Sequence, residues 1–199
     1  MNGIIIIDKP AGFTSQQVVS KVKKILNTKK AGHTGTLDPL ATGVLPVLLD
    51  DCTKASKYLI EHDKKYVAKI KFGEKRDTGD LEGKVIEISN KKIDNENNIK
   101  RILEKFIGKQ MQLPPKYSAI KINGKKLYEY ARNSEEVEIP KREIEIYKLD
   151  LINFDIENQI LKIGIFCSKG TYIRTLCEDI SEKLGIVRIY VFFKKNGSW

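Results

Sequence analysis

Histidine and cysteine are scarce in this chain of 199 residues. It contains two histidines, His33 and His62, and three cysteines, Cys52, Cys167 and Cys177. A disulfide framework uses an even number of cysteines and a zinc site uses paired thiolates or histidines, but these cysteines form an odd set without Cys-x-x-Cys spacing. The sequence therefore predicts reduced thiols and no metal site.

Long apolar segments are missing as well. The apolar run near the N-terminus covers Ile4–Ile7 and stops at Asp8, which is too short for a signal peptide or a membrane-spanning helix. The chain has no repeat and no low-complexity tract, and only residues 94–98 resemble a linker. We therefore expect one continuous domain over residues 1–199, a cytoplasmic location and no membrane contact.

Basic residues, by contrast, are abundant. The chain has 36 lysines and arginines against 26 acidic residues, which gives a net charge of +10 at pH 7. Such an excess favours a polyanionic partner, because basic side chains neutralise phosphates and release their counterions. A solvated, lysine-rich surface is the alternative explanation. With 41% hydrophobic and 31% charged residues, the composition is that of an ordinary globular protein.

Alternating apolar and polar residues predict most of the strands. Residues 66–72 alternate as in a half-buried strand, and residues 142–167 contain further alternating segments that are typical of antiparallel strands. Gly3–Asp8 is a short β-branched run that indicates a buried strand. The apolar run Val44–Leu49 contains Pro46, which limits it to an edge strand or a packed loop.

Helices are expected between the groups of strands. Thr14 or Ser15 is placed to cap a helix whose apolar residues share one face. Residues 97–108 predict an amphipathic helix that stops at a glycine, and residues 171–185 predict a helix capped by Thr171. Strands outnumber helices and no regular βαβ rhythm appears, so the predicted fold class is α+β with a mixed, largely antiparallel sheet.

One acidic side chain stands out in the segment GHTGTLDPLATGVLP, residues 32–46. Asp38 lies between turns rich in glycine and threonine, which hold a short acid in a fixed orientation. It is either an Asx-turn acid that caps a local turn, or a carboxylate nucleophile or base. A carboxylate keeps its charge beside a cation, and Arg174 is a candidate for that cation. The spacing in the sequence does not by itself place Arg174 beside Asp38.

Three other candidates have two explanations each. His33 is either a loop histidine bonded to the backbone or an exposed ring that stacks or donates a hydrogen bond. Tyr66 is either a core residue or an aromatic platform for a base. Residues 77–83 lack the ligand ladder and terminal glutamate of a calcium loop, so they are interpreted as a hairpin turn in which Asp80 is available for an ion-pair network.

Basic and aromatic residues are interleaved between residues 114 and 142. Such a pattern suits RNA, because unstacked bases meet the rings and phosphates meet the cations. A solvated amphipathic hairpin is the alternative. The candidates for RNA binding are Lys116, Lys121, Lys125, Lys126 and Arg132, and the interleaved tyrosines are Tyr117, Tyr128 and Tyr130.

The segment GHTGTLDPLATGVLPV, residues 32–47, resembles the central motif of the bacterial TruB family of tRNA pseudouridine synthases. Four more blocks resemble that family in the expected order: DKPAGFTS (8–15), KKYVAKIKFGEKRDTGDLEG (64–83), PPKYSAIKINGKKLYEYAR (114–132) and CSKGTYIRTLCEDISEKLG (167–185). The resemblance implies a pseudouridine-synthase-like catalytic domain. It also implies isomerisation of a T-loop uridine of tRNA, number 55 by tRNA convention, to pseudouridine.

The resemblance implies roles for individual residues. Asp38 would start breakage of the bond between ribose and uracil, and Arg174 would pair with Asp38 and hold it ionised. Tyr66 would stack on the flipped uracil and take part in proton removal from its C5. His33 would occupy the space that the flipped base leaves, and Asp80 would belong to the surrounding charge network.

Further implications concern the partner and the chemistry. Lys9 and Pro10 match the family's N-terminal motif, which packs beneath the active-site loops. Residues 114–142 would form the thumb that pins the RNA hairpin, so the implied partner is the T stem-loop of tRNA, bound by a monomer. Exchanging a C–N for a C–C glycosidic bond conserves every atom and needs no hydrolytic water. A single catalytic acid and the absence of a cofactor agree with that reaction.

The residues after Gly185 depart from the family's pattern. Arg188 stands where a small residue is usual, Phe193 stands at the position of a leucine that contacts the uracil, and Lys194 and Lys195 replace an arginine pair. The chain then stops at residue 199, without the family's C-terminal RNA-binding domain. We expect either a naturally minimal enzyme with a drifted tail or a chain altered or truncated after Gly185.

Two other functions are compatible with these features. A guide-RNA-directed synthase of the archaeal and eukaryotic type usually carries flanking extensions and lacks this thumb, which disfavours it for so short a chain. A catalytically silent RNA-folding factor would use the same surface and would tolerate loss of Asp38.

Overall fold

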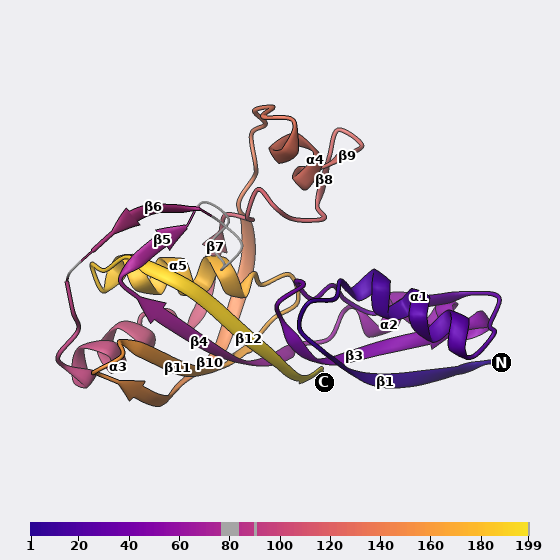
Figure 1. Ribbon diagram of the computed structural model, residues 1–199, viewed down its shortest axis with the longest axis horizontal. Helices are drawn as coiled ribbons and strands as arrows, with labels where there is room; N and C mark the ends of the chain where they lie inside the picture. Colours follow the sequence, from indigo (N-terminus) through magenta and orange to yellow (C-terminus); the bar gives the residue numbers. More distant parts are fainter. Residues whose placement is uncertain (77–83, 90, 199) are drawn as a thin grey trace.

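The computed structural model describes residues 1–76, 84–89 and 91–198. Its largest element is an eight-stranded sheet with the order β1-β3-β12-β4-β11-β10-β7, in which β2 also pairs with β3 (Figure 1). Every pair in this sheet is antiparallel except β12–β3, which is parallel. The predicted α+β class and mixed, mostly antiparallel sheet are therefore confirmed. The strands are β1 Gly3–Lys9, β2 Ala31–His33, β3 Thr42–Leu49, β4 Lys64–Phe72, β7 Gly108–Gln112, β10 Arg142–Asp155, β11 Ile160–Cys167 and β12 Arg188–Ser198.

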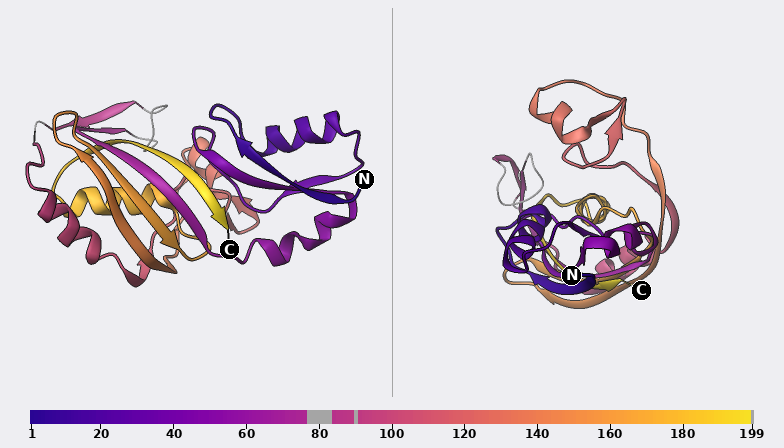
Figure 2. Two further views of the ribbon diagram at one scale, coloured as in Figure 1. Left: turned by 90° about the horizontal axis from the view of Figure 1, so that it is seen from below. Right: turned by 90° about the vertical axis from the view of Figure 1, so that its right-hand side faces the viewer.

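Helices pack against both ends of the sheet. α1 packs on β2 and β3, whereas α3 packs on β10 and α5 packs on β4 and β12 (Figures 1 and 2). No helix in the described part of the chain has the length and apolar character that a membrane span requires. The helices are α1 Ser15–Ile25, the 3-10 helix η1 Asp50–Ala55, α2 Ser56–Leu59, α3 Glu96–Glu104, α4 Leu127–Arg132 and α5 Ile173–Lys183; two small hairpins pair β5 Glu74–Arg76 with β6 Val85–Ile88, and β8 Lys121–Ile122 with β9 Lys125–Lys126.

The alternating residues 66–72 bury one face of β4 in the hydrophobic core. Ala68 and Ile70 of β4 lie opposite Ile163 and Leu161 of β11, and all four side chains have no exposed surface. α5 covers this face with buried residues that include Ile180. Burying an aliphatic side chain of this size contributes roughly 1.5–3 kcal/mol, so this core fixes β4 relative to α5.

The helix caps are partly as predicted. The Thr14 hydroxyl oxygen accepts a hydrogen bond from the Gln17 N–H (3.1 Å), and the Gln17 side chain accepts one from the Thr14 N–H (2.7 Å), so the predicted cap is confirmed. The predicted cap at Thr171 is wrong, because α5 begins at Ile173 without a side-chain cap. The Thr171 hydroxyl instead donates to the Ser168 carbonyl (2.9 Å) and closes the preceding turn.

Residues 44–49 belong to an internal strand, and the edge strand or packed loop predicted from Pro46 is wrong. β3 pairs with β1 on one side and with β2 and β12 on the other. The Pro46 carbonyl accepts the Thr34 N–H (3.3 Å) on the β2 side, so the Pro46 nitrogen, which has no hydrogen, faces that side too. It lies between residues 47–49, which pair with β2, and residues 42–43, which pair with β12. The N–H that Pro46 lacks would therefore point between β2 and β12, where neither strand pairs with β3.

Residues 113–141, hereafter the projecting segment, stand away from the sheet between β7 and β10 (Figures 1 and 2). Asn123 and Gly124 form the turn between β8 and β9 with positive φ angles of 51° and 82°, as Asn-Gly hairpin turns require. The Tyr130 hydroxyl of α4 donates to the Ile122 carbonyl (3.1 Å). The hairpin and α4 are thus tied together in one small unit.

Candidate active site

A cleft of about 750 Å³ opens where the loop 34–38, β4, β12, α5 and the base of the projecting segment meet. Four residues singled out in the sequence line it, namely Asp38, Tyr66, Arg174 and Phe193. Each comes from a different part of the chain, so the fold alone brings them together. A pocket of this size is in the range of small-molecule and nucleoside sites.

The backbone on both sides of Asp38 is fixed by the N-terminal part of the chain. The buried Ser15 hydroxyl accepts the Leu37 N–H (2.9 Å) and donates to the Leu37 carbonyl (3.2 Å). On the other side, the Lys9 ammonium donates to the Pro39 carbonyl (3.0 Å). Ser15 was considered in the sequence only as a helix cap, because nothing local indicates a bond to a residue 22 positions away.

Lys9 is a buried cation at this junction. Its side chain has no exposed surface, and its ammonium also donates to the Pro10 carbonyl (2.9 Å) and the Phe13 carbonyl (2.6 Å). Burial lowers the pKa of Lys9, and the nearby Asp38 carboxylate opposes that shift. Three carbonyls therefore satisfy the three donors of the ammonium, and Lys9 locks the first turn of the chain to the loop that carries Asp38.

The Asp38 carboxylate forms an ion pair with Arg174, the second residue of α5. The Arg174 Nε lies 2.7 Å from Asp38 Oδ2, and Nη2 donates to Oδ1 (3.3 Å). Two parallel contacts of this kind fix the orientation of both groups. The same Nη2 donates to the Tyr117 carbonyl (3.0 Å) in the projecting segment. Arg174 thus joins the acid to the base of that segment, and 136 residues separate the paired partners.

Two aromatic rings form one wall of the cleft. Tyr66 and Phe193 pack edge to face, with ring centroids 6.0 Å apart and an interplanar angle of 85°. Burial raises the pKa of the Tyr66 hydroxyl, and the acidic groups of Cys167 and Asp38 raise it further. The phenol therefore stays neutral near pH 7 and offers an uncharged ring to a ligand.

Gly43 allows β12 to reach the cleft. β12 pairs in parallel with β3 through Lys194 opposite Thr42 and Lys195 opposite Gly43. A Cβ atom on Gly43 would lie 2.2 Å from the Lys195 carbonyl oxygen, and Gly43 has a φ of 107°, which side-chain-bearing residues rarely adopt. The sequence placed Gly43 in a motif but did not indicate that the distant strand β12 pairs with it.

Of the candidates for the catalytic group and for contact with the target nucleotide, His33 does not line the cleft and Asp80 is not described. His33 ends β2 beside Thr34, which lines the cleft, and its Nδ1 accepts the Gly35 N–H at 3.4 Å. Burial lowers the pKa of His33. Asp80 lies outside the described residues.

The basic residues of the projecting segment are partly engaged within it. Lys125 pairs with Glu135 (2.6 Å) and lies over the Tyr130 ring at 4.6 Å from its centroid. Lys126 and Arg132 lie over the Tyr128 ring, at 5.3 and 5.4 Å. Lys121 is exposed at the start of β8, and no ion pair of it occurs among the described residues. Cations and aromatic rings therefore share one surface of the segment.

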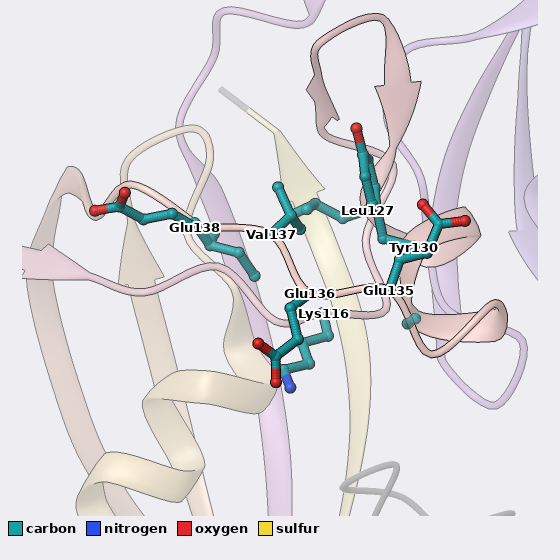
Figure 3. A pocket seen from close by; sticks show the side chains of 9 residues that line it. Lys116, Leu127, Tyr130, Glu135, Glu136, Val137 and Glu138 are labelled. Carbon is teal, nitrogen blue, oxygen red and sulfur yellow. The ribbon is translucent and has the colours of Figure 1, made fainter.

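The projecting segment also has an acidic pocket of about 420 Å³, which sequence reasoning missed (Figure 3). Its lining includes Glu135, Glu136 and Glu138 around the apolar Val137, and the candidate RNA-binding residue Lys116. Lys116 does not line the cleft that contains Asp38. The alternation of residues 137–140 predicted a strand, and that prediction is wrong, because residues 135–141 have no regular secondary structure.

The cysteines and the possible metal ligands are considered together. Cys52, Cys167 and Cys177 all lie in the described part of the chain, and none of them forms a disulfide bond. Within the described residues, no three His, Cys, Asp or Glu side chains are grouped so as to hold a metal ion. Burial raises the pKa of the Cys167 thiol to about 11, so it is an uncharged core residue near pH 7.

Comparison with known proteins gives a consistent result. The family model described as "TruB family pseudouridylate synthase (N terminal domain)" matches residues 23–173. A tRNA pseudouridine synthase B of Clostridium acetobutylicum is 49% identical over 185 residues, which cover 93% of this chain and 63% of that protein. The protein of the same name from Oceanobacillus iheyensis is 47% identical over 186 residues, which cover 93% of this chain and 61% of that protein. The chain thus spans less than two thirds of the length of these relatives.

Solved structures resemble the fold. The crystal structure of a Cbf5-Nop10-Gar1 complex matches with a TM-score of 0.74 and 31% identity, over 98% of this chain and 48% of that one. A structure of an H/ACA RNP bound to a substrate RNA containing 2'-deoxyuridine matches with a TM-score of 0.71 and 27% identity, over 98% of this chain and 47% of that one. Together with the family match over residues 23–173, these similarities show that the chain belongs to the TruB family of pseudouridylate synthases.

Proposed function

We propose that this protein isomerises uridine 55 in the T loop of tRNA to pseudouridine, with Asp38 as the catalytic group. The observation that carries the proposal is the Asp38 carboxylate, which faces the cleft while Arg174 holds it at 2.7 Å. Support comes from the family and from relatives named tRNA pseudouridine synthase B. The Arg174 guanidinium holds the Asp38 carboxylate in a fixed orientation before any substrate binds. An acid that acts without a second carboxylate requires such preorganisation.

The reaction conserves all atoms. The C1'–N1 bond breaks and a C1'–C5 bond forms, while C5 loses a proton and N1 gains one. Asp38 would initiate this exchange, either by attack on the sugar or base or by removal of a ribose proton. The neutral Tyr66 ring would stack on the uracil, which is worth roughly 1–3 kcal/mol per base, and Phe193 would support that ring from its edge.

The target base must leave its stack to reach Asp38. Extrusion costs a few kcal/mol, and least where the nucleotide already lies in a loop. In this proposal the projecting segment acts as the thumb that grips the RNA hairpin, with Lys121, Lys126 and Arg132 toward the phosphates. Its contact to Arg174 through the Tyr117 carbonyl would place gripped RNA directly over the acid. His33 would fill the space that the base leaves.

Tritium release tests the proposal directly. A T stem-loop RNA with tritium at C5 of the target uracil is incubated with wild-type protein and with Asp38→Asn, which has the same shape but no charge. We expect release by wild type alone, while the variant keeps its RNA affinity and its unfolding temperature. Equal release by the two proteins, or none by either, would reject the proposal.

A synthase that depends on further components is the second candidate, because the two solved structures described above are of multi-component complexes. The same assay separates the two when only the protein and tRNA are present. Release under these conditions supports the stand-alone enzyme, whereas release only after addition of guide RNA supports the second candidate.

We also propose that the protein acts as a monomer on cytoplasmic tRNA. The cleft is assembled from elements of one chain, which supports activity as a monomer. Light scattering across the concentrations used in the assay checks this: activity that rises with a dimer fraction would contradict it.

A further inference from the structure

Lys195 is a buried lysine in the catalytic cleft to which the mechanism above gives no task. It lies on β12 directly opposite Tyr66 of β4, is 3% exposed, and lines the same cleft as Asp38. Its neighbour Lys194 points to the other face of the strand, where it is half exposed and lies 3.6 Å from Asp8. The two adjacent lysines therefore have the same charge and very different surroundings.

No hydrogen bond or ion pair of the Lys195 ammonium occurs among the described residues. Burial, and to a lesser extent the charge of Lys64, lower its pKa to about 8. The Lys195 nitrogen is not one of the fully buried unpartnered atoms of the described residues, so it keeps contact with the open cleft. A cation that is largely removed from water is stabilised by an anion, and such groups are normally paired. The ammonium is therefore available to an anion that enters the cleft.

The anion does not come from the cleft itself. Two acidic residues line it, and both are already paired, Asp38 with Arg174 and Glu143 with Lys109 at 3.5 Å. The basic residues that face the cleft with Lys195 are Lys64, Arg142, Lys169 and Arg174. An anionic ligand is the remaining partner.

We propose that the Lys195 ammonium binds a backbone phosphate next to the flipped uridine, and so positions the nucleotide between Tyr66 and Asp38. This inference rests on the proposed function. Uracil and ribose are uncharged, so the phosphodiester is the anion that an extruded nucleotide brings into the cleft. An ammonium offers three donors and a compact charge, which suits a phosphate.

The test measures RNA binding to three variants at pH 7. Lys195→Met removes the charge and keeps the length, Lys195→Arg keeps a charge, and Lys194→Met is the matched control that removes the adjacent lysine. We expect Lys195→Met to weaken the dissociation constant for a T stem-loop RNA roughly 10- to 100-fold. Lys194→Met should change it less than threefold, and Lys195→Arg should retain most of the affinity.

Two RNAs locate the contact, each with a neutral methylphosphonate on one side of the target uridine. With one of them, wild type and Lys195→Met should bind equally, because the phosphate that Lys195 recognises is gone. Wild-type affinity for the unmodified RNA should also fall between pH 7 and 9 as the ammonium loses its proton, and this fall should vanish with that methylphosphonate RNA. The pH series needs no variant, so it stands even if Lys195→Met fails to fold.

The outcomes separate this inference from the proposed function. If wild type neither binds nor isomerises the RNA, the proposed function fails. If wild type does both but Lys195→Met behaves like Lys194→Met, or loses the same affinity on both methylphosphonate RNAs, the assignment of Lys195 alone is overturned.

Discussion

Replacing Gly43 by alanine tests whether the close pairing of β3 with β12 is needed for the structure of the cleft. The new Cβ would lie 2.2 Å from the Lys195 carbonyl oxygen and 2.8 Å from its nitrogen, whereas ordinary contact begins at 3.4 Å. Both obstacles are backbone atoms, so no side-chain rotation relieves the clash. β12 must therefore move away from β3 by about 1.2 Å at this point.

Two terms set the size of the effect. Alanine at a φ of 107° stores roughly 1–3 kcal/mol of backbone strain, and separation of the strands weakens the contacts of β12. A total of roughly 2–5 kcal/mol would lower the unfolding temperature of a chain of this length by about 5–15 °C. Because Phe193 and Lys195 shift with the strand, we expect activity to fall roughly 100-fold, as displacements near 1 Å do in active sites.

The assay combines thermal unfolding, followed by circular dichroism, with tritium release measured well below the transition. Gly32→Ala is the matched control, because Gly32 also lies in a strand paired with β3, has no atom within 4 Å of its would-be Cβ and has no positive φ. An unfolding temperature and activity for Gly43→Ala equal to those of Gly32→Ala would refute the reasoning, since the strands would then not need this close approach.

Two further changes test the anchor of the acid and the grip on RNA. Lys9→Met leaves three carbonyls without their donor and should lower the free energy of unfolding by about 2–4 kcal/mol in urea denaturation, whereas the exposed Lys24→Met should change it by less than about 0.5 kcal/mol. Equal midpoints for these variants would contradict the anchoring role. Lys121→Ala should reduce the slope of log affinity against log salt by about 0.7–0.9, and Lys125→Ala by less, because Glu135 already neutralises Lys125. Unchanged slopes in both variants would exclude the projecting segment from RNA binding.

The features that the sequence predicted well are those set by near neighbours. The alternation in residues 66–72 predicted β4 because one face of the strand is buried along its whole length. The cap at Thr14 depends on Gln17, three residues away. In both cases, the interacting groups lie within one turn or one pleat, so the local sequence contains the whole cause.

The features that the sequence missed depend on pairing across the chain. Pro46 occupies an internal strand because its lost donor falls between two partners, and neither partner is visible from residues 44–49. The approach of β12 to Gly43 is of the same kind. The family resemblance named Asp38 and Arg174 together and implied that Lys9 packs beneath the active-site loops. The 2.7 Å contact of the ion pair, the Ser15 anchor and the carbonyl partners of Lys9 follow only from the packed fold.

In the proposed reaction one carboxylate would suffice, because the surrounding groups hold Asp38 in one orientation. Ser15 and Lys9 hold the peptide groups before and after Asp38, so the backbone cannot turn the acid away. Arg174 then fixes the carboxylate itself, and its remaining contact reaches the Tyr117 carbonyl at the base of the projecting segment. A displacement of that segment by bound RNA would thus be transmitted through one guanidinium to the acid. The proposed reaction conserves every atom, so an acid preorganised in this way would need no second carboxylate of the kind that a hydrolytic site uses.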